Sequence, residues 1–295
     1  MNYFKPEGTN FNTVFNKEFL SSAQNLEKAM LCKTILEAKV LMCDNNFNLI
    51  VDIPGFSAMI PHEEVAMTAD GNPCREIAVI TRVGKSVCFV IEAIDGKNIL
   101  LSRKKAQEIC LNEYISQLEL GQVIDARITH FEPFGAFCDI GCGVIALLSI
   151  DCISVSRISH PKDRFRIGQY IKAAVRSKEP NGSLIKISLT HKELLGTWRE
   201  NADKFTVGQT VAGIVRSVES YGIFVELTPN LSGLSELKEG VEQGQIAAVY
   251  IKNIIKEKMK VKLVIVDFHS NDGSLNKKTD YFITDGNIEG WDYYS

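Results

Sequence analysis

Two pairs of aromatic residues are the side chains of this 295-residue sequence best suited to hold a flat ligand. Phe134 and Phe137 form one pair, Tyr221 and Phe224 form the other, and in each pair a glycine directly follows the first ring. Exposed aromatic rings stack on nucleobases, contribute about 1–3 kcal/mol per base and depend little on base identity. The alternative is that one ring of each pair belongs to a hydrophobic core.

The two pairs belong to a longer pattern that repeats along the chain. Tyr221 follows Phe134 by 87 residues, and the same interval separates Gly121 from Gly208, at which the two clear copies begin. A fainter copy upstream aligns Phe47 with Phe134, again 87 residues apart. Internal repetition at a fixed interval indicates an array of similar domains, so the function is expected on a face that these domains share.

Each copy has the pattern of a small β-domain. In the middle copy, apolar alternation and turn signals predict five short strands, at 122–131, 136–141, 144–148, 168–177 and 184–190. Short twisted sheets remove their exposed edges by closing into barrels. We therefore predict an all-β-dominated fold of tandem five-stranded barrels joined by short helices.

Amphipathic segments separate these barrels and predict helices at about 17–31, 102–118 and 190–205. Trp198, in the third helix, is expected to anchor the linker on a barrel. The predicted organisation is an N-terminal extension (1–32), a degenerate first repeat (33–104), a second repeat (117–192), a third repeat (204–268) and an acidic-aromatic tail (269–295) with a small hairpin at 281–291.

Composition narrows the class of protein. The formal net charge of −3 argues against bulk electrostatic coating of nucleic acid, but residues 117–199 hold 11 Lys and Arg against 8 Asp and Glu. No apolar run is long enough for a membrane span, and the N-terminus has no leader pattern, so we expect a cytoplasmic protein without membrane partners. The eight cysteines lack Cys-x-x-Cys spacing, which predicts free thiols, no metal and no cofactor.

The five strands, the aromatic-Gly-x-aromatic second strand and an apolar-Lys-apolar closing strand resemble the S1 RNA-binding domain, a branch of the oligonucleotide-binding OB-fold. Further matches in the middle copy are Arg157–Pro161, Gly168 with Gln169, and Leu189 with Thr190. The resemblance covers about residues 33–268, and the three copies with helical spacers are similar to a short member of the bacterial ribosomal protein S1 family. It implies non-catalytic binding of single-stranded RNA or mRNA, in translation or as an RNA chaperone or regulator, with the 30S ribosomal subunit as a further partner.

The resemblance and the charge pattern together predict the site residues. Both aromatic pairs become stacking platforms, and neighbouring cations are expected to follow the phosphates. Gly135 and Gly222 are expected to host bulges that bring both rings of a pair to one side. The residues expected to contact RNA are Phe134, Phe137, Arg127, Arg157, His160, Lys162, Arg164, Lys186, Tyr221, Phe224, Arg216 and Lys260.

Some of these residues have a second interpretation. Lys258, Lys260 and Lys262 are expected to share one strand face, where they either line RNA or protect a solvated edge. His160 precedes Pro161, so it either contacts RNA or only shapes a turn.

Three parts of the chain depart from the family pattern. Ser149 stands where the family often has a histidine, and repeat three lacks the long basic loop that repeat two has at about 151–166. Repeat one has Phe47 but neither the glycine nor the second ring. In ribosomal relatives a degenerate first repeat tends to dock proteins, which implies a contact with a ribosome or another protein here. The tail is expected to complete the core of repeat three, with competition against RNA as the alternative.

Two other classes of function compete with RNA binding. The net charge and acidic tail favour, as the alternative, a protein-interaction scaffold that binds little RNA. An enzyme is not expected, because the sequence has no Walker A, His-Glu-x-x-His or Gly-x-Ser-x-Gly motif and no glycine-rich dinucleotide fingerprint. The oligomeric state stays open, with a monomer as the preferred expectation.

Overall fold

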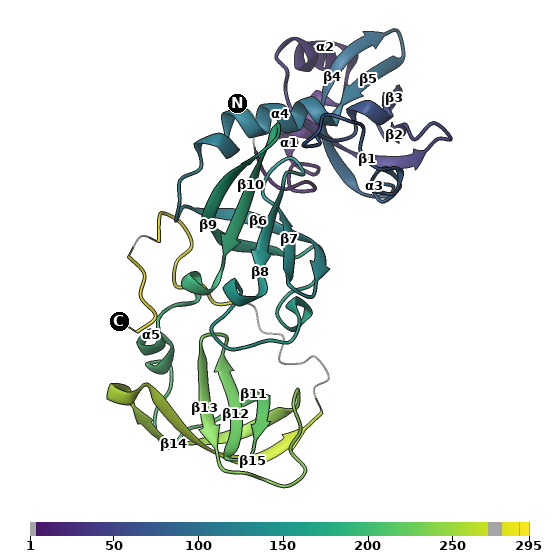
Figure 1. Cartoon of the computed structure of the whole chain (residues 1–295). Helices are drawn as coiled ribbons and strands as arrows, with labels where there is room; N and C mark the ends of the chain where they lie inside the picture. The colour runs from purple at the N-terminus through teal and green to yellow at the C-terminus, as the bar shows by residue number, and fades with distance from the viewer. Residues whose placement is uncertain (1–3, 271–278, 289, 295) are drawn as a thin grey trace.

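A computed structural model of the protein describes residues 4–270, 279–288 and 290–294. Within these residues three closed five-stranded barrels follow one another in a row, with helical segments between them (Figure 1). The predicted fold of tandem barrels is confirmed.

The first barrel has the strand order β1-β2-β3-β5-β4. Its strands are β1 (Leu36–Cys43), β2 (Leu49–Val51), β3 (Ser57–Ile60), β4 (Ser86–Asp95) and β5 (Asn98–Ser102). Its helical segments are α1 (Val14–Phe19), α2 (Ala23–Leu31), η1 (His62–Glu64) and α3 (Glu76–Ile80). The single helix predicted at 17–31 is wrong, because the Ser22 side chain accepts a hydrogen bond from the Asn25 backbone and caps a second helix there.

The middle and C-terminal barrels share the topology of the first, in which a parallel strand pair closes each barrel. The middle barrel consists of β6 (Val123–Glu132), β7 (Gly135–Asp139), β8 (Ile145–Ser149), β9 (Tyr170–Asn181) and β10 (Leu184–Thr190). The C-terminal barrel consists of β11 (Thr210–Glu219), β12 (Gly222–Thr228), β13 (Leu231–Ser235), β14 (Ile246–Ile255) and β15 (Lys260–His269). All five strands predicted for the middle repeat are present, and β9 runs further than predicted because it pairs with β10 up to the turn at Gly182.

Short helical segments connect the barrels. They are α4 (Arg103–Glu113) and η2 (Ile115–Gln117) before the middle barrel, and η5 (Lys192–Leu195) and α5 (Trp198–Ala202) after it. Three further 3-10 segments lie in loops within the barrels: η3 (Ile150–Cys152), η4 (Pro161–Asp163) and η6 (Lys256–Lys258). The helix predicted at 190–205 is interrupted at Gly196, whose φ of +82° favours glycine. Trp198 is buried in the core of the C-terminal barrel, which confirms its predicted role as an anchor. None of the helices in the described ranges has the length and apolar character to cross a membrane.

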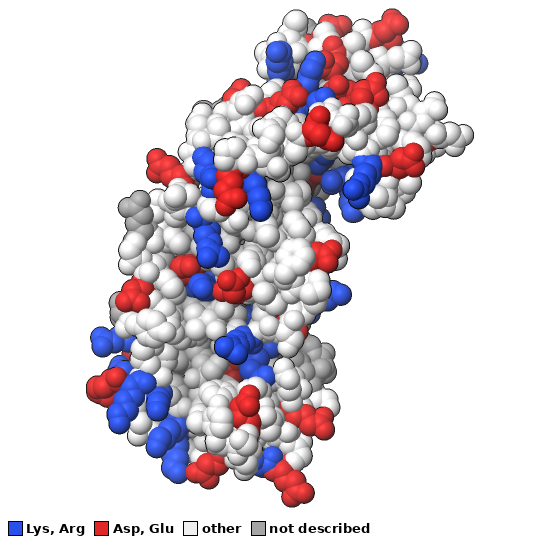
Figure 2. All heavy atoms as spheres, viewed as in Figure 1, with Lys and Arg blue, Asp and Glu red and all other residues white. Residues whose placement is uncertain are grey.

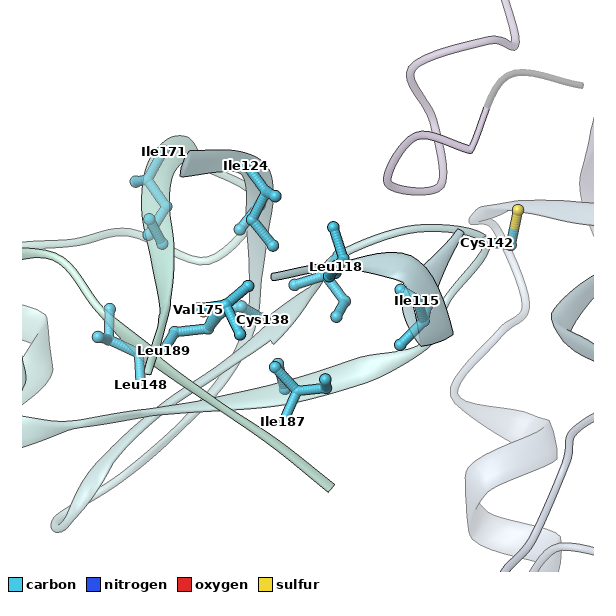
Figure 3. Packing of buried hydrophobic residues seen from close by; sticks show 14 of the residues in the cluster. Ile115, Leu118, Ile124, Cys138, Cys142, Leu148, Ile171, Val175, Ile187 and Leu189 are labelled. Carbon is cyan, nitrogen blue, oxygen red and sulfur yellow. The ribbon is translucent and has the colours of Figure 1, made fainter. Parts of the chain in front are cut away.

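Each barrel encloses its own hydrophobic core. In the middle barrel, Ile124, Cys138, Leu148 and Leu189 point inward from four different strands (Figure 3). The same cluster extends to Val90 of the first barrel, so the first two barrels share apolar contacts. All eight cysteines are free thiols, as predicted, and six of them are buried.

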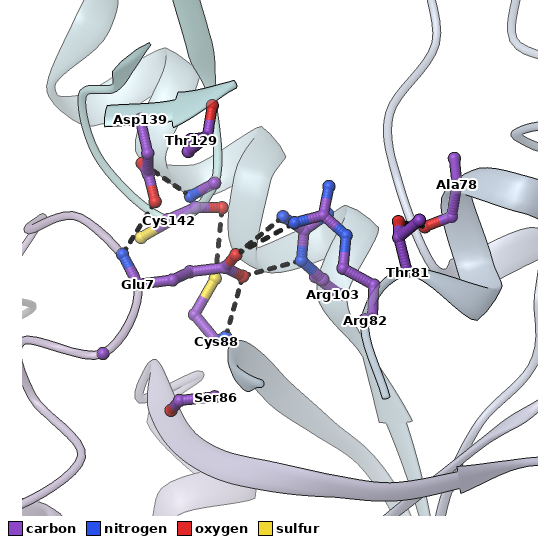
Figure 4. Close-up of polar contacts among 12 residues, drawn as sticks. Glu7, Ala78, Thr81, Arg82, Ser86, Cys88, Arg103, Thr129, Asp139 and Cys142 are labelled. Atoms are coloured by element: carbon purple, nitrogen blue, oxygen red, sulfur yellow. Dashed lines mark hydrogen bonds and ion pairs between the residues drawn. The ribbon is translucent and has the colours of Figure 1, made fainter. Parts of the chain in front are cut away.

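A buried ion pair fixes the joint between the first two barrels (Figure 4). Arg103 donates from Nε to Oε1 of Glu7 at 2.7 Å and from Nη2 to Oε2 at 3.0 Å. Burial alone would raise the pKa of Glu7, but the charge and hydrogen bonds of Arg103 lower it below the usual value, so Glu7 is a carboxylate. The Glu7 backbone N–H donates to Asp139 on β7, and the carboxylate accepts from the Cys88 backbone on β4. The N-terminal segment therefore connects both barrels.

The tail joins the linker to the middle and C-terminal barrels. Phe282 donates its backbone N–H to the Leu194 carbonyl, and the Tyr281 hydroxyl lies 3.2 Å from Nε2 of buried His191. Further along, Gly286 accepts from the Val123 backbone on β6, and the Tyr293 carbonyl accepts from the Trp198 backbone. The predicted hairpin at 281–291 is absent from the described residues 281–288 and 290–291, because their backbone groups bond to other segments instead.

Candidate nucleic-acid interface

Both aromatic pairs have the same geometry in their two barrels. The ring centroids of Phe134 and Phe137 lie 6.2 Å apart with planes at 86°, and those of Tyr221 and Phe224 lie 6.1 Å apart, also at 86°. The first ring of each pair is exposed, with 54% of Phe134 and 68% of Tyr221 accessible to solvent. None of the four rings belongs to the hydrophobic clusters that the described residues form. This placement favours stacking surfaces over core residues.

The glycine in each motif allows a neighbouring strand to approach. A Cβ on Gly135 would lie 2.5 Å from the carbonyl oxygen of Leu148 on β8, and one on Gly222 would lie 2.6 Å from that of Ser235 on β13. The predicted bulge at these glycines is wrong. The register shifts on the preceding strands instead, between Ile128 and His130 in the middle barrel and at the matching place on β11. Phe134 and Tyr221 lie in the two-residue turns that precede β7 and β12, and this position places each of them on the same side of its barrel as the second ring of its pair.

A row of outward-facing residues surrounds the second ring of the middle barrel. Phe137 pairs with His130 on β6 and with Leu147 on β8, and Leu147 pairs with Ser188 on β10. His130 stacks on Phe137 with centroids 6.0 Å apart and planes at 27°. Lys186 is exposed two residues before Ser188, so its side chain lies on the same face of β10. A second stacked ring and a cation therefore lie on the same face as the ring pair of the middle barrel.

The C-terminal barrel repeats this row with a cation in it. Phe224 pairs with Ser217 and Leu234, and Leu234 pairs with Lys262 on β15. Lys260 lies two residues before Lys262, and both are exposed on one face of the strand.

The predicted stripe of three lysines is therefore shorter than expected. Lys258 belongs to the 3-10 segment η6, and Met259 has a φ of +48° that separates it from β15. The expectation that all three lysines share a strand face is wrong, because the chain turns before the strand begins.

In the first barrel the equivalent row is aliphatic. Met42 pairs with Ile50, Ile50 with Met59, and Met59 with Leu100. Phe47 has a φ of +61° and packs against the core of its own barrel and the His62 ring, with centroids 5.7 Å apart. The first barrel therefore has no aromatic platform at this place.

Two of the predicted RNA-contacting arginines form ion pairs with Glu226 of the C-terminal barrel, and one of them comes from the middle barrel. Arg164, from the loop between β8 and β9, donates to both carboxylate oxygens of Glu226 at 2.6 and 2.5 Å. Arg216 donates from Nε to the same carboxylate at 2.7 Å. Burial opposes ionisation of Glu226, but hydrogen bonds and charge from the two arginines lower its pKa. The guanidinium groups of Arg164 and Arg216 are thus engaged within the protein, and a contact of either with RNA stays a prediction.

Arg127 has a structural role as well. Its Nη1 donates to the Glu7 carbonyl at 3.2 Å, and its guanidinium lies 5.7 Å from the centre of the Tyr170 ring. Arg127 therefore holds the N-terminal segment, and its contact with RNA stays a prediction.

Of the remaining predicted residues in this loop, His160 shapes a turn, and Arg157 and Lys162 are exposed. The His160 Nδ1 accepts from the Lys162 backbone at 3.1 Å and caps η4, and its ring contacts Phe131 edge-on. This geometry supports the turn-shaping interpretation of His160. Arg157 and the Lys162 side chain are exposed.

Sequence reasoning missed His130 and did not pair Lys262 with the platform. The positions of His130 and Lys262 beside the rings depend on how the strands pair. The sequence would predict this pairing only if the turn length and the register shift on β6 were known. Among the described residues no group of three or more His, Cys, Asp or Glu side chains is placed to hold a metal ion.

Comparison with known families agrees with this geometry. The family model of the S1 RNA binding domain matches residues 117–189, which cover the middle barrel except its last residue. Residues 117–189 therefore match an S1 RNA-binding domain.

Its relatives include small ribosomal subunit protein bS1. The protein of that name from Leuconostoc lactis is 30% identical over 243 residues, which cover 79% of this chain and 53% of the relative. The bS1 homolog of Bacillus subtilis is 29% identical over 258 residues, covering 84% and 63%. The bS1 of Rhodopseudomonas palustris is 32% identical over 196 residues, covering 64% and 33%. The chain thus spans less than two thirds of the length of each of these relatives.

Proposed function

We propose that this protein binds single-stranded RNA, including mRNA, without catalysing a reaction on it. The observation that carries the proposal is the repeated ring pair, which stands outside the core with the same geometry in the middle and C-terminal barrels. Rings so placed stack on bases of any identity, so we expect little sequence preference.

Local cations complete the proposed interface. Lys186 lies on the platform face of the middle barrel, and Lys260 and Lys262 lie on that of the C-terminal barrel. Arg157 and Lys162 are exposed on the loop after β8. These side chains supply the phosphate contacts that the net charge of −3 does not.

The first experiment is a salt titration with the wild-type protein. A fluorescently labelled single-stranded RNA of about 20 nucleotides is long enough to cover two barrels. The logarithm of its affinity is expected to fall linearly with the logarithm of salt concentration, by about 0.7 for each phosphate that a cation neutralises. Fluorescence anisotropy at four or five salt concentrations gives this slope, with duplex RNA as the comparison. Absence of binding at low salt would overturn the proposed function.

A second function, docking on a protein, is favoured by the aliphatic row of the first barrel. Met42 is 53% exposed and Leu100 is 38% exposed at the two ends of this row. An apolar face binds protein more readily than a charged RNA backbone. We infer that the first barrel docks on the small ribosomal subunit, because relatives of this chain carry the name of that subunit. A role in translation and a cytoplasmic location are part of the same proposal.

Cosedimentation with purified small ribosomal subunits tests this docking surface. Met42→Glu places a charge in the row and is expected to lower cosedimentation about tenfold, since a buried unpaired charge is costly. Leu31→Glu is the control, because Leu31 is 80% exposed on α2 and lies outside the row. If both variants cosediment like the wild type, the first barrel does not dock through this face.

A further inference from the structure

The loop between β8 and β9 begins at the platform of the middle barrel. The backbone N–H of Ile150, the first loop residue, donates to the carbonyl of Phe134 at 2.9 Å. The start of the loop is thereby tied to the turn that presents the exposed ring.

The same loop then docks on the C-terminal barrel. The Ser156 backbone donates to the Pro229 carbonyl at 3.0 Å, and its hydroxyl lies 2.8 Å from that of Ser232 on β13. The Val155 backbone donates to the side chain of fully buried Asn230. Three adjacent contacts in the described structure therefore hold the middle of the loop against the β12–β13 hairpin.

The ion pairs of Arg164 and Arg216 with Glu226 place this loop beside the ring pair of the C-terminal barrel. Glu226 follows Phe224 by two residues on β12, so the two side chains share one face at a separation of about 7 Å along the strand. Ser232 pairs with Glu226, and Leu234 pairs with Phe224. The loop contacts thus lie two residues along β12 and β13 from the pair formed by Phe224 and Leu234.

The C-terminal barrel has no comparable loop of its own. Residues 236–245, between β13 and β14, contain three glutamates and a single lysine. That lysine, Lys238, donates from Nζ to the carbonyls of Ile265 and Val266. In contrast, Arg157 and Lys162 of the middle barrel's loop are exposed. Figure 2 shows Lys and Arg side chains gathered at the junction of these two barrels, where Figure 1 places the loop.

We propose that the middle and C-terminal barrels form one composite RNA site. The loop of the middle barrel supplies phosphate contacts to a strand that passes from Phe134 and Phe137 to Tyr221 and Phe224. Arg164, Arg216 and Glu226 are positioning residues that hold the loop and both platforms in register. The inference rests on the proposed RNA binding and adds that the two platforms act on one RNA strand as a unit.

The test compares two single-stranded RNAs, of about 6 and about 20 nucleotides, because the shorter one covers one barrel only. If the two barrels are held in a fixed arrangement, the longer RNA binds both of them and gains affinity over the shorter RNA. This gain is expected to disappear when the arrangement of the barrels is lost. In Glu226→Gln the ratio of the two affinities is expected to fall at least tenfold, with the affinity for the short RNA little changed. Glu219→Gln, on the exposed end of β11, is the matched control and keeps the wild-type ratio. Near-ultraviolet circular dichroism checks that the variant is folded.

A second set of variants keeps the test decisive if Glu226→Gln does not fold. In a Phe134→Ala/Phe137→Ala background, the remaining binding comes from the C-terminal barrel. Adding Arg157→Glu on the loop is then expected to lower affinity for the short RNA about tenfold, whereas adding Lys17→Glu on α1 has no such effect.

The outcomes separate the composite site from RNA binding itself. An unchanged ratio in folded Glu226→Gln, or no effect of Arg157→Glu in the platform-deficient background, would overturn the composite site and leave RNA binding standing. Failure of the wild type to bind either RNA would overturn both proposals.

Discussion

Replacing Phe134 and Phe137 by alanine is expected to weaken binding of single-stranded RNA by about 2 kcal/mol or more, which is about 30-fold in the dissociation constant. The two rings make a T-shaped pair with centroids 6.2 Å apart, and His130 stacks on the inner one. Loss of both rings removes the surface on which bases stack, while the cations that follow the phosphates remain. The salt dependence of binding is therefore expected to stay close to that of the wild type.

Fluorescence anisotropy with the wild type and the double variant measures this loss. Tyr170→Ala is the matched control, since Tyr170 is 51% exposed on β9 of the same barrel but lies beside Arg127 and the N-terminal segment. Thermal unfolding of both variants is expected to resemble that of the wild type, because the two phenylalanines lie outside the core cluster. Equal affinities of the double variant and Tyr170→Ala would count against the platform.

Replacing Arg103 by methionine is expected to lower the free energy of unfolding by about 3–5 kcal/mol. The Arg103 side chain is 1% exposed, and its removal leaves the Glu7 carboxylate, 5% exposed, without its bidentate partner. Arg82 is the other cation beside Glu7, but its nearest nitrogen is 3.6 Å away. An uncompensated buried charge is the cause of the loss.

Urea-induced unfolding of the full chain measures the effect. Lys104→Met removes a neighbouring charge from α4 without touching Glu7 and is expected to change stability by less than about 0.5 kcal/mol. The double variant Arg103→Met/Glu7→Gln is expected to recover part of the loss, because it no longer contains an unpaired buried charge. If Arg103→Met were as stable as Lys104→Met, the ion pair would not fix the joint between the first two barrels.

The barrels and the repeated ring pairs could be predicted from the sequence because the information is local. Alternating apolar residues and turn glycines define each strand, and the 87-residue interval relates one ring pair to the next. The interruption of the linker helix at Gly196 was not predicted. Gly196 has a φ of +82°, and the ring of the tail residue Phe282 leaves no room for a Cβ there.

The roles of the cations depend on distant contacts and could not be predicted. Arg157, Lys162 and Arg164 belong to one basic run, and nothing in that run separates the exposed pair from Arg164. The difference arises from Glu226, which lies 62 residues further along the chain and becomes a neighbour only when two barrels meet. Arg127 is similar, since its partner at Glu7 lies 120 residues before it.

The most direct test of the central claim is ultraviolet cross-linking of a single-stranded RNA to the full chain, followed by mass spectrometry of the cross-linked peptides. Bases stacked on aromatic rings are close enough to form covalent links on irradiation. We expect cross-links at Phe134 or Phe137 and, on the same RNA molecule, at Tyr221 or Phe224. Cross-links confined to other faces of the barrels, with none at either ring pair, would contradict it.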